Sequence, residues 1–338
     1  MTTRGKPEGR TFEDKAAVRE RVPLLIGLTG PSGGGKTLSA LRLATGIQRV
    51  TGGDIFVVDT EARRALHYAD RFKFRHVDFG APFSSLDYLA AIEHCVNRGA
   101  GVIVVDSTSH EHEGPGGMLE FHEREVKRIS ELWRVKPSVA QLPAWHAPKR
   151  DRRKLINTVL QLPCNFIFCF RGKEKMKIKK GEDPIAMGYM AIAGDEFIFE
   201  MTINALLLPG ANGVPTWSSD EVGERQQIKR PGWAAPQLPD GEQLNEAMGE
   251  SLARWAAGNV VRGIGELLEA YGVCTTPAAL GSLEVERRGL WSRATKDEKE
   301  QLKAAADLAK ARVNEALAVA EAEPAAASTP AGDDANDL

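Results

Sequence analysis

The chain has 338 residues, of which 42% are hydrophobic and 27% charged, a composition that excludes a fully disordered chain and a small disulfide scaffold. Its 44 lysines and arginines nearly balance 46 aspartates and glutamates, so any affinity for nucleic acid or membrane has to be local. The four cysteines form no Cys-x-x-Cys pair, which favours a reducing compartment. Because no apolar run approaches the roughly 18 residues that cross a bilayer, we expect a cytoplasmic protein without a membrane anchor.

The first half of the chain has the pattern of a parallel sheet. Residues 1–22 alternate in charge and are expected to form a flexible N-terminal arm. Beyond them, short apolar runs alternate with longer segments of helical character, which predicts βα units with helices on both faces of the sheet. The predicted strands are Leu24–Leu28, Ile55–Val58, Val102–Val105 and Phe166–Phe170.

The pattern changes after residue 170. Turn signals separate further runs that predict antiparallel strands at the edge of the sheet, namely Met187–Ile192, Glu196–Leu208, Val214–Trp217 and Arg225–Ile228. An α/β core over 23–229 would then be followed by a Pro/Gly-rich linker at 230–241 and a helical C-terminal region over 242–320. The helices expected there are Glu242–Ala257, Val260–Tyr271 and Lys296–Ala320. Residues 321–338 are acidic and lack basic residues, so we expect a disordered tail.

A phosphate-binding motif follows the first predicted strand. The stretch Gly30-Pro31-Ser32-Gly33-Gly34-Gly35-Lys36-Thr37 fits the pattern G-x-x-x-x-G-K-[ST] and precedes a helix-forming run that starts at Leu38. Its glycines allow consecutive backbone N–H groups to face phosphate oxygens, and the helix N-terminus adds its positive end. The motif predicts that residues 30–38 bind ATP, with Lys36 at the β- and γ-phosphates and Thr37 at Mg²⁺.

Two carboxylates at predicted strand ends extend this interpretation. Asp106 ends the apolar run 102–105 and is the candidate second ligand of Mg²⁺, although it could instead cap the segment that follows. Glu61 follows the run that ends at Asp59, and parallel strands bring their carboxyl ends to one edge of a sheet. A glutamate there can orient a water for attack on the γ-phosphate. The alternative for Glu61 is a solvated acid in a loop.

These strands resemble those of the RecA-family recombinases. The run Val57-Val-Asp-Thr-Glu61 is similar to the strand that leads to that family's catalytic glutamate, and Ile103-Val-Val-Asp106-Ser107 is similar to its metal-binding strand. The chain also resembles compact phage-encoded RecA-like ATPases, often labelled AAA proteins, some of which are single-strand annealing proteins. The segment 166–175 and the basic loop after it carry this second resemblance, which covers 23–209. Where the recombinases have a glutamine that senses the γ-phosphate, this chain has Arg171.

The resemblance implies a fold, an activity and partners. It implies a RecA-like P-loop core in which Glu61 and Lys36 catalyse hydrolysis of ATP, and self-association into a ring or filament. Because RecA-like cores place ATP between subunits, a cation of one subunit can act on its neighbour's ATP, and the candidates are Arg171, Lys173 and Lys175. The family acts on single-stranded DNA, which implies a DNA-dependent ATPase of phage recombination or annealing in the cytoplasm of a bacterial host. Other phage recombination or single-strand-binding proteins are the further partners implied.

Positive charge gathers between Arg124 and Lys180, where sixteen basic residues accompany four acidic ones. An anionic partner explains such an asymmetry in a nearly neutral chain. The predicted contacts to single-stranded DNA are Lys175, Lys177, Lys179 and Lys180, which occupy the position of the recombinases' second DNA-binding loop. A solvated basic face or a surface between subunits is the alternative, and Trp133 and Trp145 could either stack on bases or be buried.

Two other classes of function fit the same phosphate loop. A P-loop kinase would use it, although Glu61 argues against a kinase. A nucleotide-dependent regulator or assembly factor that binds protein through the C-terminal helices would hydrolyse ATP without stimulation by DNA. The histidines His110, His112 and His122 also allow a metal site, but the glycines at 114–117 favour a mobile loop near the nucleotide.

Overall fold

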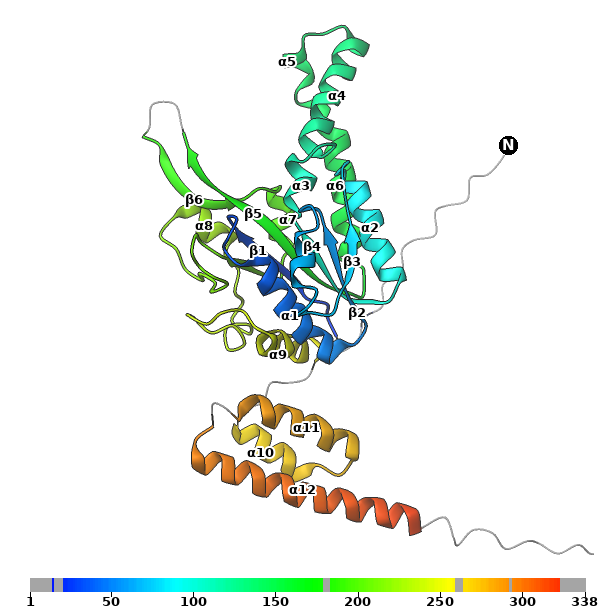
Figure 1. Ribbon diagram of the computed structural model, residues 1–338, viewed down its shortest axis with the longest axis vertical. Coiled ribbons are helices and arrows are strands. Elements are labelled where there is room, and N and C mark those ends of the chain that lie inside the picture. The colour runs from blue at the N-terminus through cyan, green and yellow to red at the C-terminus, as the bar shows by residue number, and fades with distance from the viewer. Residues whose placement is uncertain (1–13, 15–20, 179–182, 259–263, 292–293, 323–338) are drawn as a thin grey trace, which may run out of the picture.

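The protein is an α/β fold in which helices flank a mostly parallel seven-stranded sheet (Figure 1). The computed structural model describes residues 14, 21–178, 183–258, 264–291 and 294–322. The sheet has the order β3-β2-β4-β5-β1-β7, and β6 pairs with β5. The strands are β1 (Leu25–Gly30), β2 (Asp54–Asp59), β3 (Arg75–Asp78), β4 (Ala100–Asp106), β5 (Asn165–Lys177), β6 (Ile185–Ala191) and β7 (Ile203–Leu206). The expectation of an α/β protein with a mainly parallel sheet is confirmed.

Helices cover both faces of this sheet. The first ones are α1 (Lys36–Thr51), η1 (Arg64–Tyr68), α2 (Ser85–Asn97), α3 (Ser109–Glu113), α4 (Met118–Trp133), α5 (Pro137–Ala140), η2 (Pro143–Trp145) and α6 (His146–Val159). The later ones are α7 (Asp195–Phe199), α8 (Val222–Gln227), α9 (Glu246–Ala256), α10 (Ile264–Val273), α11 (Pro277–Leu290) and α12 (Lys296–Ala322). Alternate residues of the central strands face α1 and α9 on one side and α2 and α6 on the other, as a doubly covered sheet requires. All four cysteines are free and buried.

The chain after residue 195 differs from the predicted run of antiparallel strands. The range Glu196–Leu208 divides into helix α7 and strand β7, and β7 pairs parallel with β1. Arg225–Ile228, predicted as a strand, lies largely in helix α8. Val214–Trp217 contributes one isolated bridge, between Leu206 and Thr216. Of this group, the segment predicted as Met187–Ile192 does form an antiparallel strand, β6.

Side chains of α8 explain why no further strand pairs with the edge of β6. Glu224 accepts the backbone N–H of Tyr189 at 2.7 Å, and Gln227 accepts that of Ala191 at 2.7 Å. The free edge of β6 is therefore satisfied by carboxylate and amide oxygens of a helix rather than by another strand. The segment 225–228 is too short and too polar for periodicity to distinguish a strand from a helix.

Strand β5 extends well beyond the predicted Phe166–Phe170. Up to Arg171 it pairs in parallel with β1, and from Gly172 to Lys177 it pairs antiparallel with β6. The second half of β5 and β6 thus form a hairpin that projects from the sheet (Figure 1). The predicted DNA contacts Lys179 and Lys180 lie outside the described residues.

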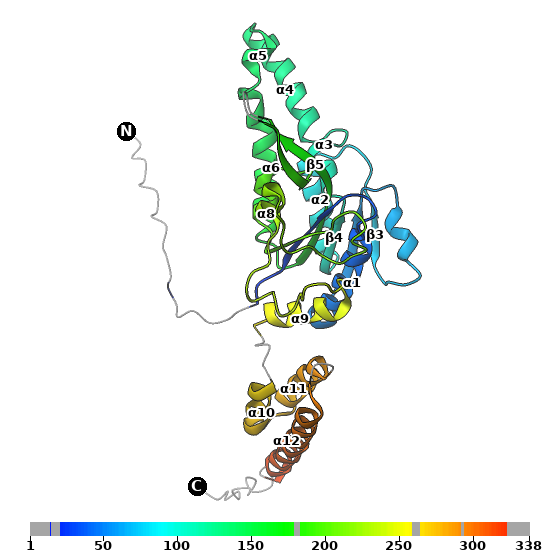
Figure 2. The same ribbon diagram turned by 90° about the vertical axis from the view of Figure 1, so that its left-hand side faces the viewer.

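A helical projection rises from the same end of the molecule. It consists of α4, α5, η2 and α6, residues 118–159, and we call it the stalk (Figures 1 and 2). Its own small core contains Val126, Ile129, Ala140 and Ala144. At its base, Arg152 is 2% exposed and donates to both carboxylate oxygens of Glu111 in α3, at 3.1 and 2.6 Å. This buried pair ties the stalk to the segment that follows β4.

The segment 230–241, expected to be a linker, packs on the sheet instead. Ala234 and Leu238 are buried in the same core as β1 and α1, and Met248 and Leu252 of α9 join them. Helices α10, α11 and α12 enclose a separate core. The boundary between packing units therefore falls after α9 and not at 230–241.

Most of the predicted N-terminal arm and the tail from 323 onward lie outside the described residues. None of the described helices is long and apolar enough to cross a membrane.

Candidate functional site

The phosphate-loop motif connects β1 to α1, as its sequence predicts. β1 ends at Gly30, and α1 begins at Lys36. Gly33 and Gly35 have φ values of 83° and 93°, in the left-handed region that strains other residues. A Cβ at Gly35 would also lie 2.6 Å from the backbone nitrogen of Gly213. The turn therefore needs glycine at both positions, one of which the motif specifies.

Lys36 curls back over this loop. Its Nζ donates to the carbonyl oxygens of Gly30 and Pro31, at 2.8 and 2.7 Å. Burial lowers the pKa of Lys36, while neighbouring groups such as Asp106 and Glu61 act in the opposite direction. An ammonium group bonded to neutral carbonyls in this way can exchange them for a charged acceptor, which forms stronger hydrogen bonds.

The parallel strands bring the predicted carboxylates to one edge of the sheet. In the register, Asp59 of β2 pairs with Asp106 of β4, and Asp106 pairs with Cys169 of β5. Strand β5 in turn pairs in parallel with β1. The residues that follow β2 and β4 therefore lie at the edge of the sheet from which the phosphate loop starts. The sequence-based placement of Glu61, Asp106 and the loop at one edge thus agrees with the geometry.

Asp106 contacts the phosphate loop directly. It is 5% exposed, and the Thr37 hydroxyl donates to its Oδ2 at 2.5 Å. Burial raises the pKa of Asp106, and the hydrogen bond from Thr37 offsets this effect only in part. The two side chains predicted to share a cation are therefore adjacent. The capping role considered for Asp106 is not the contact that the structure shows.

Glu61 is held by an arginine of its own chain. Arg171 donates from Nε to Oε1 and from Nη2 to Oε2, each at 2.8 Å. Arg171 was a candidate for acting on a neighbouring subunit, and its partner here, Glu61, is the predicted water-orienting residue. Local sequence carries no signal for this contact, because it joins residues that are 110 positions apart in the chain.

The histidines that could have formed a metal site bind different partners. His110 Nδ1 lies 2.7 Å from the Thr60 hydroxyl, His112 Nδ1 lies 3.0 Å from Arg152, and His122 Nε2 lies 2.9 Å from a backbone carbonyl. Burial lowers the pKa of His110 and of His112. In the part of the chain that the structure describes, no group of three or more His, Cys, Asp or Glu side chains is placed to hold a metal ion.

Two of the predicted DNA-binding lysines, Lys175 and Lys177, lie on β5 in the β5–β6 hairpin. Lys173, Lys175 and Lys177 alternate along β5 and are exposed, so they occupy one face of the strand. Met176 is exposed on the other face, as 63% of its surface is accessible. The hairpin therefore presents a row of cations that starts two residues after Arg171.

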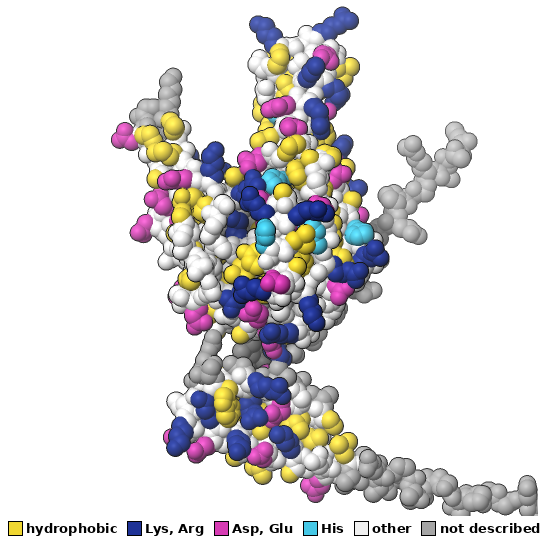
Figure 3. All heavy atoms as spheres, viewed as in Figure 1, with side chains coloured by type: hydrophobic (Ala, Val, Ile, Leu, Met, Phe, Trp, Pro, Cys, Tyr) yellow, Lys and Arg dark blue, Asp and Glu magenta, His cyan; other side chains and the backbone are white. Residues whose placement is uncertain are grey.

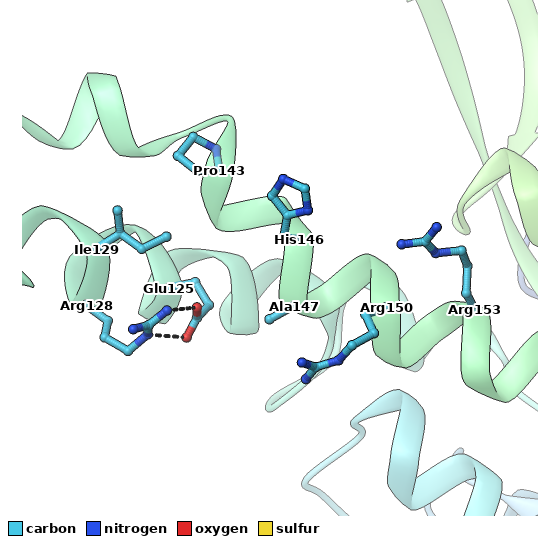
Figure 4. Close-up of a pocket in the computed structure, with 8 residues that line it drawn as sticks. All are labelled: Glu125, Arg128, Ile129, Pro143, His146, Ala147, Arg150 and Arg153. Carbon is cyan, nitrogen blue, oxygen red and sulfur yellow. Dashed lines mark hydrogen bonds and ion pairs between the residues drawn. The ribbon is translucent and has the colours of Figure 1, made fainter. Parts of the chain in front are cut away.

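Further cations line the stalk (Figure 3). Figure 4 shows a pocket on it, lined by Glu125, Arg128, Ile129, Pro143, His146, Ala147, Arg150 and Arg153. Arg128 donates to both oxygens of Glu125, at 2.9 and 2.7 Å, which neutralises part of the charge of the pocket.

The two tryptophans considered for stacking on bases differ in exposure. Trp133 is 54% exposed at the far end of the stalk, whereas Trp145 stacks on His122 with ring centroids 3.9 Å apart. Trp133 is thus the more accessible of the two.

A scan against models of known protein families gives no match for this chain, and a search of curated proteins gives none either. The chemistry of the site itself therefore carries the functional conclusion. It offers the N-terminus of α1 and Lys36 to an anion, oxygen atoms of Thr37 and Asp106 to a hard cation, and Glu61 to a water.

Proposed function

We propose that the protein is a RecA-like P-loop ATPase that binds single-stranded DNA and acts in phage DNA recombination or annealing. The observation that carries the ATPase part of this proposal is the contact between Thr37 and Asp106, which joins the phosphate loop to the end of β4. Glu61 lies at the end of the adjacent strand β2, where it can face the same phosphates. A parallel sheet with β5 between β1 and β4 is compatible with such a core.

The residues present fit a magnesium ion. Mg²⁺ prefers oxygen ligands and keeps several waters and substrate phosphates, and the Thr37 hydroxyl and the Asp106 carboxylate are donors of this kind. Burial raises the pKa of Asp106, and Thr37 and Lys36 offset this only in part, so a cation would stabilise the carboxylate. When bound, Mg²⁺ would neutralise charge on the β- and γ-phosphate oxygens.

The remaining chemistry belongs to side chains of the chain itself. Lys36 would leave the carbonyls of Gly30 and Pro31 to bind phosphate oxygens. Glu61 would orient a water in line with the γ-phosphate and accept its proton. The water oxygen then forms the new bond to the γ-phosphorus, and the bond to the oxygen that bridges the β- and γ-phosphates breaks.

The hairpin and the stalk support the proposal that DNA is the partner. Lys173, Lys175 and Lys177 are exposed in one row, which suits the phosphates of a single strand. Exposed Trp133 offers a surface on which a base can stack. Self-association into a ring or filament belongs to the same proposal, with Lys173 and Lys175 as cations for a neighbour's ATP and other phage recombination or single-strand-binding proteins as further partners.

Steady-state hydrolysis of ATP with Mg²⁺, measured with and without single-stranded DNA, tests the proposal. We expect DNA to stimulate wild type, and Glu61→Gln to lose hydrolysis while it still binds ATP, because the amide cannot accept the proton. Glu200→Gln is the matched control, since Glu200 is exposed and lies outside the site. Retention of DNA is followed on the same samples by anisotropy of a labelled oligonucleotide.

The same experiment separates the alternatives. Hydrolysis that DNA does not change, together with no DNA binding at low salt, would contradict the DNA proposal and indicate a nucleotide-dependent regulator. Transfer of the γ-phosphate to an acceptor other than water would indicate a P-loop kinase. Full activity of Glu61→Gln would contradict the role of Glu61 in either case.

A further inference from the structure

Arg171 engages both oxygens of the carboxylate proposed to orient water. The two hydrogen bonds, from Nε to Oε1 and from Nη2 to Oε2, are each 2.8 Å long. The side chain of Glu61 is 12% exposed, whereas that of Arg171 is 39% exposed. Arg64 approaches the same Oε2 at 3.5 Å, as a weaker contact from an exposed side chain. Arg171 is therefore the main partner of Glu61 and is still accessible to an outside anion.

This pairing makes Glu61 a poor base. Burial alone would raise the pKa of Glu61, but the hydrogen bonds and the charge of Arg171 outweigh it, so the pKa lies below its ordinary value. A carboxylate with a lowered pKa accepts a proton from water less readily. To turn towards a water, Glu61 must also break two charge-assisted hydrogen bonds. Loss of the pair would thus favour hydrolysis twice over, because Glu61 would become a stronger base and would be free to turn towards the water.

The backbone of Arg171 lies where β5 leaves the parallel sheet. It pairs with Gly30, the first residue of the phosphate loop. Its N–H donates to the Ser109 hydroxyl at 2.8 Å, and its carbonyl accepts the N–H of Ile192 at 2.8 Å. The next residue, Gly172, already belongs to the β5–β6 hairpin. A shift of the hairpin therefore acts directly on the residue that holds Glu61.

A polyanion on the hairpin would also compete for Arg171. The exposed lysines start at Lys173, two residues from Arg171, and continue at Lys175 and Lys177. Phosphates bound along this row would bring acceptors close to the guanidinium, which binds phosphate in the same bidentate manner as carboxylate. Each bond that Arg171 gives to a phosphate is one that it no longer gives to Glu61.

We propose that Arg171 is a positioning residue of its own subunit, which holds Glu61 in an unreactive pair and releases it when single-stranded DNA binds the β5–β6 hairpin. This inference rests on the proposed function, because it names the step by which DNA stimulates hydrolysis. It assigns Arg171 to the site of its own chain rather than to a neighbour's.

The test compares wild type with Arg171→Met and Arg171→Lys in the full-length protein. With no DNA, we expect Arg171→Met to hydrolyse ATP several-fold faster than wild type, through kcat rather than KM, and an oligo-dT strand to add little further stimulation. Arg171→Lys keeps one charged donor but not the bidentate fork, and should restore part of the dependence on DNA. The matched control is Arg63→Met, because Arg63 is exposed and pairs with Asp78 at 2.8 Å.

Each outcome decides between the roles of Arg171. A fall in kcat of Arg171→Met with and without DNA would overturn the inference and indicate that Arg171 stabilises the transition state. An unchanged basal rate with full stimulation would overturn it as well. If wild type neither binds DNA nor responds to it, the DNA proposal fails, yet a raised basal rate in Arg171→Met would still support the restraint on Glu61. Absence of hydrolysis in every variant would contradict both.

Discussion

Asp106 is the buried carboxylate that we propose as a ligand of Mg²⁺. Its side chain is 5% exposed, and burial raises its pKa although Thr37 donates a hydrogen bond to it. A carboxyl group whose pKa is raised in the folded state opposes folding when it ionises. This penalty is present at pH values above the folded-state pKa and is relieved as the pH falls through it.

We therefore expect Asp106→Asn to stabilise the protein in the absence of nucleotide and Mg²⁺ while hydrolysis is lost. The amide keeps an oxygen for the Thr37 hydroxyl and removes the charge, a gain of roughly 1–3 kcal/mol if the group behaves as other undercompensated buried groups do. Thermal unfolding near neutral pH measures the change. Asp54→Asn, which removes an exposed carboxylate paired with Arg75 at 2.9 Å, is the control and should give no gain. A lower midpoint for Asp106→Asn than for wild type would contradict this account.

At the residue scale, the sequence predicts what local spacing determines. Residues 30–38 form the expected turn because the glycines and the strand and helix around them are neighbours in the chain. The placement of Asp106 at the same edge of the sheet as the phosphate loop was predictable, because parallel strands bring their carboxyl ends to one edge. The contact between Glu61 and Arg171 was not, because it depends on β5 lying between β1 and β4, and strand order leaves no local trace in the sequence.

Gly172, at the start of the β5–β6 hairpin, packs closely against Gly30 of the phosphate loop. A Cβ on Gly172 would lie 2.9 Å from the backbone of Gly30, closer than side chains tolerate. Gly172→Ala should push the hairpin and the loop apart and weaken ATP binding by about tenfold, which corresponds to roughly 1.4 kcal/mol and to the usual range for overpacking. Titration with a fluorescent ATP analogue measures this. Gly232→Ala is the control, since open space surrounds Gly232, and an equal loss in both variants would show that the contact has no special role.

The lysine row of the hairpin makes a quantitative prediction for DNA binding. Replacement of Lys173, Lys175 and Lys177 by alanine should weaken oligo-dT binding and reduce the slope of log K against log salt by about 2, since each phosphate contact to a single strand contributes about 0.7. Fluorescence anisotropy at several salt concentrations gives this slope. Substitution of Lys296, Lys299 and Lys303 in α12 removes the same charge elsewhere and should leave the slope unchanged. Equal slopes for wild type and the hairpin variant would show that these lysines do not contact DNA.

At the element scale, long apolar runs were predicted well and short ones were not. The strands that became β1, β2 and β4 are buried on both faces, so their sequences are continuous and distinctive. Strand β3 was missed because its four residues, Arg75–Asp78, include three polar ones at the edge of the sheet. The segment Arg225–Ile228, predicted as a strand, lies largely in α8, where the contacts of Glu224 and Gln227 with β6 favour the helix.

At the scale of the whole molecule, the domain boundary predicted from composition at 230–241 is wrong. Proline and glycine in 230–241 predict a linker, but turns of this composition also form in a chain that lies on a core. Ala234 and Leu238 within this segment and α9 after it fill the face of the sheet that α1 leaves open. The close approach of α9 to α1 needs Gly46, where a Cβ would lie 1.9 Å from the carbonyl oxygen of Glu246. Which apolar residues share a core is a property of the folded chain that spacing along the sequence does not contain.

Truncation tests this boundary. A chain that ends at residue 258 keeps α9 and should fold and bind ATP, whereas one that ends at residue 229 should not fold stably. The shorter chain loses Leu238, Leu244, Met248 and Leu252 from the core of the sheet, and each buried side chain of this size contributes about 2–5 kcal/mol, against a total stability of about 5–15 kcal/mol for a typical domain. Circular dichroism melts and binding of a fluorescent ATP analogue distinguish the two. A cooperative melt and ATP binding in the chain that ends at 229 would contradict this account and indicate that the core ends before 230–241, as composition predicts.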